Sequence, residues 1–139
     1  MIVAGIGCRR GASTEQIKAV LAAALAAAGL AHDALDLIAA PIAKRDEQGI
    51  AAAASALGLR LVLVSQTDLA QAAARTTTHS ERVMALMGLP SVAEASALAA
   101  AGPDARLLAA RTVLGPATCA LAATEAAKKT AKEPAREPA

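Results

Sequence analysis

A chain of 139 residues is long enough for one domain, and with 55% hydrophobic residues it can bury a core. Phe, Tyr and Trp are absent, so the core is aliphatic and a flat ligand would have to lie on aliphatic side chains. The net charge of +2 argues against a nucleic-acid partner, and no apolar run reaches the roughly 20 residues that span a membrane. Two cysteines are too few for a disulfide framework, so we expect a cytoplasmic protein with free thiols.

The N-terminal segment predicts a short buried strand that leads through a glycine-rich loop into a helix. We expect the strand at residues 2–6 and expect the loop glycines to permit a tight turn that exposes backbone N–H groups. The start of a helix favours anions because its first N–H groups lack partners. The pattern therefore indicates a site for a negatively charged ligand, and the alternative is a tight turn without one. The loop residues concerned are Gly5, Gly7, Arg9, Arg10 and Gly11.

The glycine spacing does not match the common nucleotide-binding motifs. A dinucleotide fingerprint has two residues before its last glycine, this loop has three, and no GK[ST] follows. Cys8 is a conceivable nucleophile, since the helix start and Arg9 would stabilise its thiolate. A small buried cysteine is the alternative. His32 and His79 are too few and too scattered for a metal site, and we expect neither a metal nor a cofactor.

Strands and helices alternate through the first half of the chain. Ser13 and Gln16 fit a capping box at the start of the first helix, and Gly29 and Gly58 are typical helix stops. The pattern predicts strands at 35–39 and 59–65, and helices at 13–28, 44–57 and 67–73.

A charged cluster, Lys44, Asp46 and Glu47, follows the second predicted strand. The loops after parallel strands lie along one edge of a sheet, so we expect this cluster to face the loop at 5–13. Lys44 and Glu47 are therefore candidates for ligand binding and for acid–base catalysis. The alternative is a solvated helix start with acidic residues in its first turn.

The second half predicts two short helices and two closing strands. Ser80 caps the first helix, while Ser91 and Glu94 form a capping box for the second, which ends near Gly102. We expect antiparallel strands at 107–113 and 117–123. Residues 124–139 have the composition of a disordered tail, which leaves one domain at 1–123. The order of elements favours a three-layer α/β/α sandwich with a mixed, mainly parallel sheet.

Several segments together resemble one family. Residues 5–13, GIGCRRGAS, are similar to the GIGCR-G-(T/S) motif of the cobalamin-biosynthesis family that comprises CobE and the C-terminal domain of CbiG. Residues 42–50 resemble its K-x-x-E-x-G segment, residues 80–97 its S-x-x-V…G…V-A-E-A-x-A stretch, and residues 118–122 its final strand. Arg111 departs from the pattern, which has a lysine there. Because the chain begins at the motif, it resembles the free-standing CobE form.

The resemblance implies a role in making the corrin ring of vitamin B12, by the aerobic route for the free-standing form. Arginines and helix N–H groups suit the carboxylates of a corrinoid or precorrin intermediate, and aliphatic side chains suit the ring face. Two hypotheses stay open. The first is a protein that holds this intermediate or passes it on, with other enzymes of the pathway as partners. The second is an enzyme that acts on the ring periphery, as in lactone opening by the fused relatives. Since no nucleophile–base pair is visible, we favour binding. The candidate ligand-binding residues are Gly5, Gly7, Cys8, Arg9, Arg10, Gly11, Ser13, Lys44, Glu47, Ser80 and Glu94.

Overall fold

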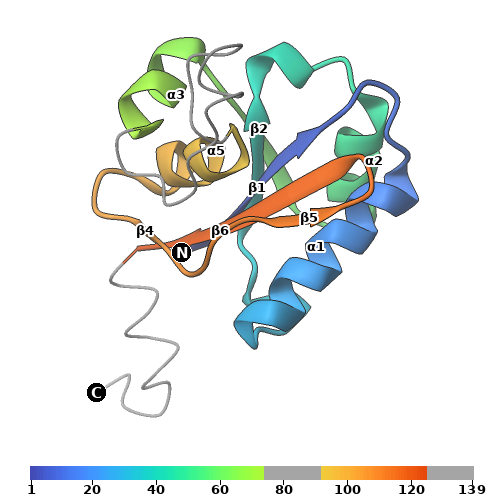
Figure 1. The fold of residues 1–139 in the computed structure, drawn as a ribbon, viewed down its shortest axis with the longest axis horizontal. Coiled ribbons are helices and arrows are strands. Elements are labelled where there is room, and N and C mark those ends of the chain that lie inside the picture. Colours follow the sequence, from blue (N-terminus) through green and yellow to red (C-terminus); the bar gives the residue numbers. More distant parts are fainter. Residues whose placement is uncertain (74–91, 125–139) are drawn as a thin grey trace.

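A six-stranded mixed sheet forms the centre of the computed structural model, which describes residues 1–73 and 92–124 (Figure 1). The strand order is β3-β2-β1-β6-β4, and β5 pairs with β6. The first three strands are parallel, whereas β6 is antiparallel to β1, β4 and β5. The strands are β1 (Ile2–Cys8), β2 (Leu37–Pro41), β3 (Arg60–Val64), β4 (Arg106–Leu107), β5 (Thr112–Leu114) and β6 (Ala117–Ala123).

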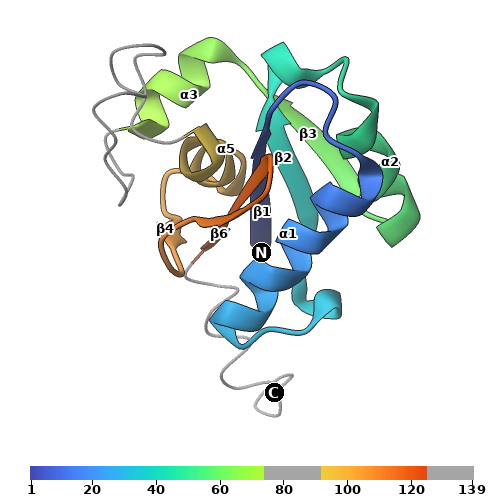
Figure 2. The same ribbon diagram turned by 45° about the vertical axis from the view of Figure 1, so that its right-hand side comes forward.

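Helices cover both faces of the sheet, which Figure 2 shows nearly edge-on. One face carries α1 (Thr14–Ala28) and α2 (Gln48–Leu57), and the other carries α3 (Gln66–Ala73) and α5 (Val92–Ala101). The expected three-layer α/β/α architecture is confirmed. None of the helices in the described residues is long and apolar enough to cross a bilayer.

The core consists of two aliphatic layers, one on each side of the sheet. Side chains alternate along β1, so Ala4 and Ile6 face α1 and α2 while Val3 faces α5. Full burial of each larger aliphatic side chain contributes about 1.5–3 kcal/mol. The first layer includes Ile6, Ile17, Leu21, Ile38 and Ile50, and the second includes Val3, Leu37, Val64, Leu69 and Leu98.

The predicted ends of the first two helices are largely confirmed. Ser13 and Gln16 form the capping box of α1, with N–H to side-chain oxygen distances of 3.0 and 2.9 Å. Gly29 and Gly58 end α1 and α2 in the left-handed conformation. The start of the second helix was misplaced, because Ile42–Lys44 form a 3-10 turn and α2 begins only at Gln48.

The first strand is longer than expected. It continues to Cys8, so Gly5 and Gly7 lie within β1, and in the loop that follows Gly11 has a positive φ, of 82°. Gly5 is required for packing rather than for turning. A Cβ atom there would lie 2.6 Å from the backbone nitrogen of Ala97 and closer still to the carbonyl oxygen of Ala93. The missing side chain lets α5 lie directly on β1.

The expected strand at 107–113 is wrong, because two short strands replace it. β4 and β5 both pair with β6, and residues 108–111 between them leave the strand geometry. The backbone N–H of Arg111 in this connection donates to the side chain of Glu94 instead of to a neighbouring strand. The antiparallel pairing of the closing strands is confirmed.

Thr124 marks the end of the described chain. Its N–H donates to the carbonyl oxygen of Met1 at 3.1 Å, so both ends of the described chain lie together beyond the start of β1. The predictions for Ser80, for Ser91 and for a disordered tail concern residues that lie outside the described ones.

Gly5→Ala should destabilise the protein strongly, because the new methyl group would meet the backbone of α5. Overpacking of this kind costs about 1–3 kcal/mol or more. Gly7→Ala is the matched control on the same strand, since its Cβ would meet its nearest atoms at 3.9 and 4.0 Å. Urea unfolding followed by circular dichroism measures both variants, because the chain has no Trp or Tyr. Equal stability losses in the two variants would contradict this account of Gly5.

Candidate functional site

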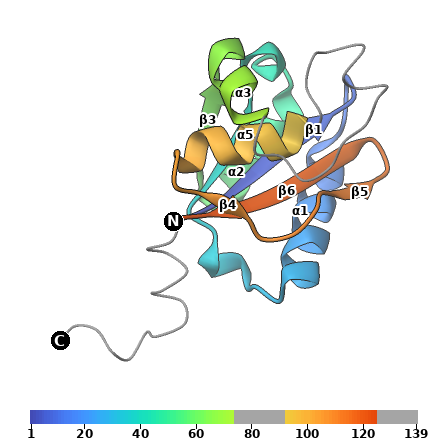
Figure 3. The same cartoon turned by 60° about the vertical axis from the view of Figure 1, so that its left-hand side comes forward.

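A cavity of about 340 Å³ opens at the carboxyl ends of β1 and β2, on the face that carries α3 and α5. Its walls come from the end of β1, the turn after β2, the starts of α3 and α5, and the hairpin between β5 and β6. Figure 3 shows α3 and α5 in front of the sheet with this hairpin beside them. Ligands commonly bind at the carboxyl edge of parallel strands in open α/β sheets.

Three cationic side chains line the cavity, and each comes from a different segment. Arg9 follows β1, Lys44 ends the turn after β2, and Arg111 lies between β4 and β5. Among the described residues that line the cavity there is no Asp or Glu. The cavity therefore presents cationic residues from several directions.

The remaining wall is mostly apolar, with Pro41, Leu69 and Val92 among its residues. At its mouth Val113 is 60% exposed, and Ile42, in the turn beside it that carries Lys44, is 40% exposed. These two side chains give the mouth aliphatic surface that a ligand can cover. The combination suits a molecule with an apolar body and negatively charged substituents.

The backbone of the loop is less available to anions than its sequence suggests. Four of its N–H groups already donate within the protein: Arg9 to Pro116, Gly11 to Glu47, Ala12 to Arg9 and Ser13 to Gln16, over 2.9–3.2 Å. The expectation that the loop exposes free N–H groups for a ligand is therefore wrong for these four. Side chains, not loop amides, supply the positive character of the cavity.

The predicted contact between the charged cluster and the loop is confirmed. Glu47 Oε1 accepts the Gly11 N–H at 2.9 Å. Two residues further on, Gly49 lets the start of α2 approach the backbone of Ala12 and Ser13, where a Cβ would lie 3.1 Å from the Ser13 carbonyl carbon. Glu47 and Gly49 thus hold the loop against α2.

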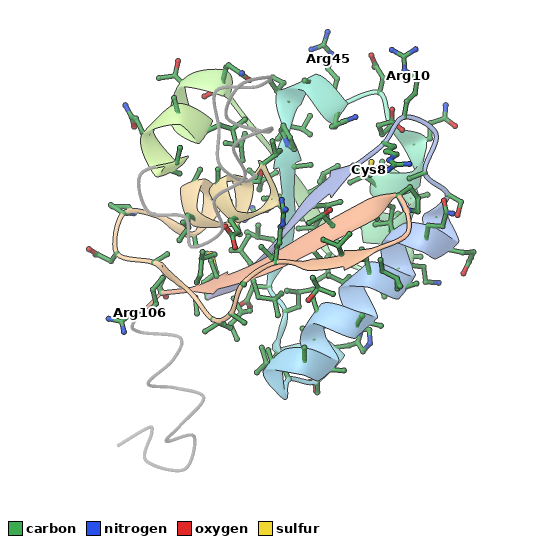
Figure 4. All side chains as sticks on the ribbon, in the orientation of Figure 1. Cys8, Arg10, Arg45 and Arg106 are labelled. Carbon is green, nitrogen blue, oxygen red and sulfur yellow. The ribbon has the colours of Figure 1, made fainter. Side chains whose placement is uncertain are left out.

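Arg9 and Arg10 lie at different places on the protein surface. Arg9 lines the cavity, whereas Arg10 lines a separate hollow together with Gly11, Asp46 and Glu47. Figure 4 shows Arg10 and Arg45 pointing outward at the same end of the molecule, near Cys8, with Arg106 at the opposite end. The expected pair of arginines at one site is therefore split between two surfaces.

Cys8 is half-buried at the cavity wall. Burial raises the pKa of its thiol above the ordinary value; Lys44 lowers this pKa and Glu47 raises it, but by less than burial does. The hypothesis that the helix start and Arg9 favour the thiolate is therefore wrong in direction, and the alternative of a buried cysteine agrees with the structure. The second cysteine, Cys119, is fully buried, and burial raises its pKa to about 12.

The structure brings Gly7, Cys8, Arg9 and Lys44 together at the cavity. Three other candidates serve elsewhere: Gly5 lies under α5, Ser13 caps α1, and Glu94 is fully buried behind the cavity wall. Arg111 is the cationic residue of the cavity lining that was not among the predicted candidates. Its signal in the sequence was the cation that the resemblance predicts at this position. Within the described residues there is no group of three or more His, Cys, Asp or Glu side chains that could hold a metal ion.

A family model described as "Cobalamin synthesis G C-terminus" matches residues 2–122. The chain belongs to this family. It is a cobalamin biosynthesis protein of the CobE and CbiG C-terminal type, as the resemblance implied. A curated relative, "Protein CobE" from a Sinorhizobium species, is 38% identical over 121 residues, which cover 87% of this chain and 79% of the relative.

Solved structures of this family share the fold. The crystal structure of CobE, "a protein from the cobalamin (vitamin B12) biosynthetic pathway", is 36% identical with a TM-score of 0.81, and 88% of this chain and 89% of that one are covered. Cobalamin biosynthesis protein chiG from Agrobacterium tumefaciens is 46% identical with a TM-score of 0.73, over 90% of this chain and 99% of that one. A cobalamin biosynthesis protein G homolog from Sulfolobus solfataricus, 22% identical with a TM-score of 0.66, shows the same fold in 37% of a longer chain.

In this member of the family we expect Cys8 to react slowly with iodoacetamide at neutral pH, because its raised pKa keeps the thiol protonated and only the thiolate is nucleophilic. The alkylation rate should rise through a midpoint above the ordinary thiol pKa. Lys44→Ala should move this midpoint up and Glu47→Gln should move it down, since each removes one charge. Mass spectrometry of the labelled protein gives the rate. Fast labelling of Cys8 at pH 7, or shifts of the opposite sign, would refute this electrostatic picture.

Proposed function

We propose that this protein binds a carboxylate-rich corrinoid or precorrin intermediate of cobalamin biosynthesis in the cavity at the carboxyl ends of β1 and β2. The observation that carries the proposal is the arrangement of Arg9, Lys44 and Arg111 around an apolar cavity whose described lining contains no acid. Corrin precursors carry acetate and propionate side chains around a large apolar ring. Charge-assisted hydrogen bonds from guanidinium and ammonium groups suit these carboxylates.

The size of the cavity supports binding by one edge of the ring. About 340 Å³ is at the small end of the range of small-molecule sites, roughly 300–1,000 Å³. A tetrapyrrole would insert one edge with its carboxylates and leave the rest of the ring outside. There the exposed side chains of Ile42 and Val113 offer aliphatic surface for the ring face.

The described groups favour binding over turnover. The Cys8 thiol has a raised pKa, which makes it a poor nucleophile at neutral pH. Glu47 accepts a hydrogen bond from the loop and lines the neighbouring hollow, so the role that its contacts indicate is structural. Lys44 is the residue that keeps the enzyme alternative open, because it combines a place in the cavity with a titratable group.

A titration with two corrin probes tests the proposal. Cobyrinic acid carries free peripheral carboxylates, whereas in cobinamide the same groups are amides. We expect the wild type to prefer cobyrinic acid, and Arg9→Ala, Lys44→Ala and Arg111→Ala each to weaken its binding by roughly tenfold, as for one charge-assisted hydrogen bond. Higher salt should reduce these differences because the cavity is open to solvent. The corrin absorbance spectrum reports the bound fraction.

Arg106→Ala is the matched control, because Arg106 is an exposed arginine at the opposite end of the molecule (Figure 4). Equal affinity for both probes, or equal losses from Arg106→Ala and Arg111→Ala, would overturn the proposed site. Mass spectrometry of stoichiometric mixtures with pathway intermediates distinguishes binding from catalysis. A new product that Lys44→Ala abolishes would replace the binding function with an enzymatic one.

A further inference from the structure

Glu94 carries a carboxyl group in the interior of the protein. It lies in the first turn of α5 and has no solvent-exposed surface, in a helix whose neighbouring residues are almost all aliphatic. Burial of a carboxyl group is costly unless it is hydrogen-bonded. Its Oε2 atom accepts the backbone N–H of Arg111 at 3.1 Å.

The partner of Glu94 belongs to the segment that brings a cation to the cavity. Arg111 lies where the chain has left β4 and has not yet entered β5, so its N–H has no partner in the sheet ladder. A backbone N–H in a partly buried position needs an acceptor. Glu94 supplies that acceptor, and Arg111 itself lines the cavity.

The position of Glu94 is itself rigidly determined. It follows Val92 and Ala93, which both line the cavity, and Ala93 packs directly on Gly5 of β1. The helix that carries Glu94 is therefore held against the central strand at this turn. A hydrogen bond from a helix fixed in this way restricts the position of the irregular connection that donates to it.

We infer that Glu94 is a positioning residue for ligand binding: its buried carboxyl group fixes the connection at Arg111 and so directs the guanidinium of Arg111 toward the carboxylates of the ligand. Glu94 does not touch the ligand. This inference rests on the proposed function, because it gives one cation of the proposed site a defined support. This role differs from the capping-box role that the sequence predicts for Glu94.

The experiment measures the affinity of Glu94 variants for the same two probes. Glu94→Leu removes the acceptor, and we expect it to weaken binding of cobyrinic acid by about tenfold and binding of cobinamide much less. Glu94→Gln keeps an oxygen that accepts the N–H, so its affinity should stay within about threefold of wild type. Glu94→Asp retracts the carboxyl group by one methylene and should give a partial loss, which keeps the test open if Glu94→Leu does not fold.

Two further variants separate positioning from a general loss of structure. In an Arg111→Ala background, Glu94→Leu should cause no additional loss of cobyrinic acid affinity, because both changes act through the same guanidinium. Ser96→Ala is the matched control on the same helix, since its buried hydroxyl makes no hydrogen bond in the structure. It should leave the affinity unchanged. Thermal unfolding confirms that each variant is folded.

The outcomes distinguish this inference from the proposed function. If wild type prefers cobyrinic acid but Glu94→Asp and Glu94→Leu bind it like wild type, the positioning role is overturned and the binding function stands. Additive losses in the double variant, or equal losses for both probes, overturn it too. A wild type that binds neither probe overturns the binding function together with this inference.

Discussion

The close contact between β1 and α5 at Gly5 determines where the groups around the cavity lie. Because Gly5 has no side chain, the backbone of α5 rests on the central strand at Ala93 and Ala97. This contact places Val92 and Ala93 in the cavity wall and brings the next residue, Glu94, within reach of the β4–β5 connection. A methyl group at one position would push the helix away, and the wall and its hydrogen bond would move with it.

A second set of contacts fixes the position of the loop on the other side of the cavity. Glu47 holds the loop after β1 through the N–H of Gly11, and Gly49 lets α2 approach that loop closely. The two family motifs, one after β1 and one after β2, are therefore parts of a single unit. In it the loop amides are used for internal bonds, and the cations Arg9 and Lys44 are left to face the cavity.

The sequence predicts the fold well where local chemistry decides the structure. The capping box at Ser13 and the helix stops at Gly29 and Gly58 depend on residues close in the chain, and the structure confirms them. It predicts less well where a distant segment decides. Nothing near Gly5 in the sequence reveals that α5 packs on it. The acceptor of the Arg111 N–H is likewise distant, because Glu94 lies 17 residues away.

The candidate site also contains residues that the sequence predicts and residues that it does not. Gly7 and Cys8 end β1, and Arg9 and Lys44 follow the adjacent parallel strands β1 and β2. A topological rule is therefore enough to bring these residues together. Arg111 reaches the cavity from the antiparallel half of the sheet, which that rule does not cover. Of the two interpretations of Cys8, the buried cysteine agrees with its pKa and the stabilised thiolate does not. This pKa depends mainly on burial, a property of the folded wall that a nearby arginine in the sequence does not reveal.

The hydrogen bonds between Met1 and Thr124 have a practical consequence for the way this domain can be joined to other molecules. Both ends of the described chain lie at the edge of the sheet where β1 begins and β6 finishes, whereas the cavity lies where β1 finishes and β6 begins. The length of the sheet separates the points of attachment from the mouth. A tether, a surface or a neighbouring domain connected at either point would leave the mouth of the cavity accessible. The domain can therefore be attached at one end of the sheet while a large ring binds at the other.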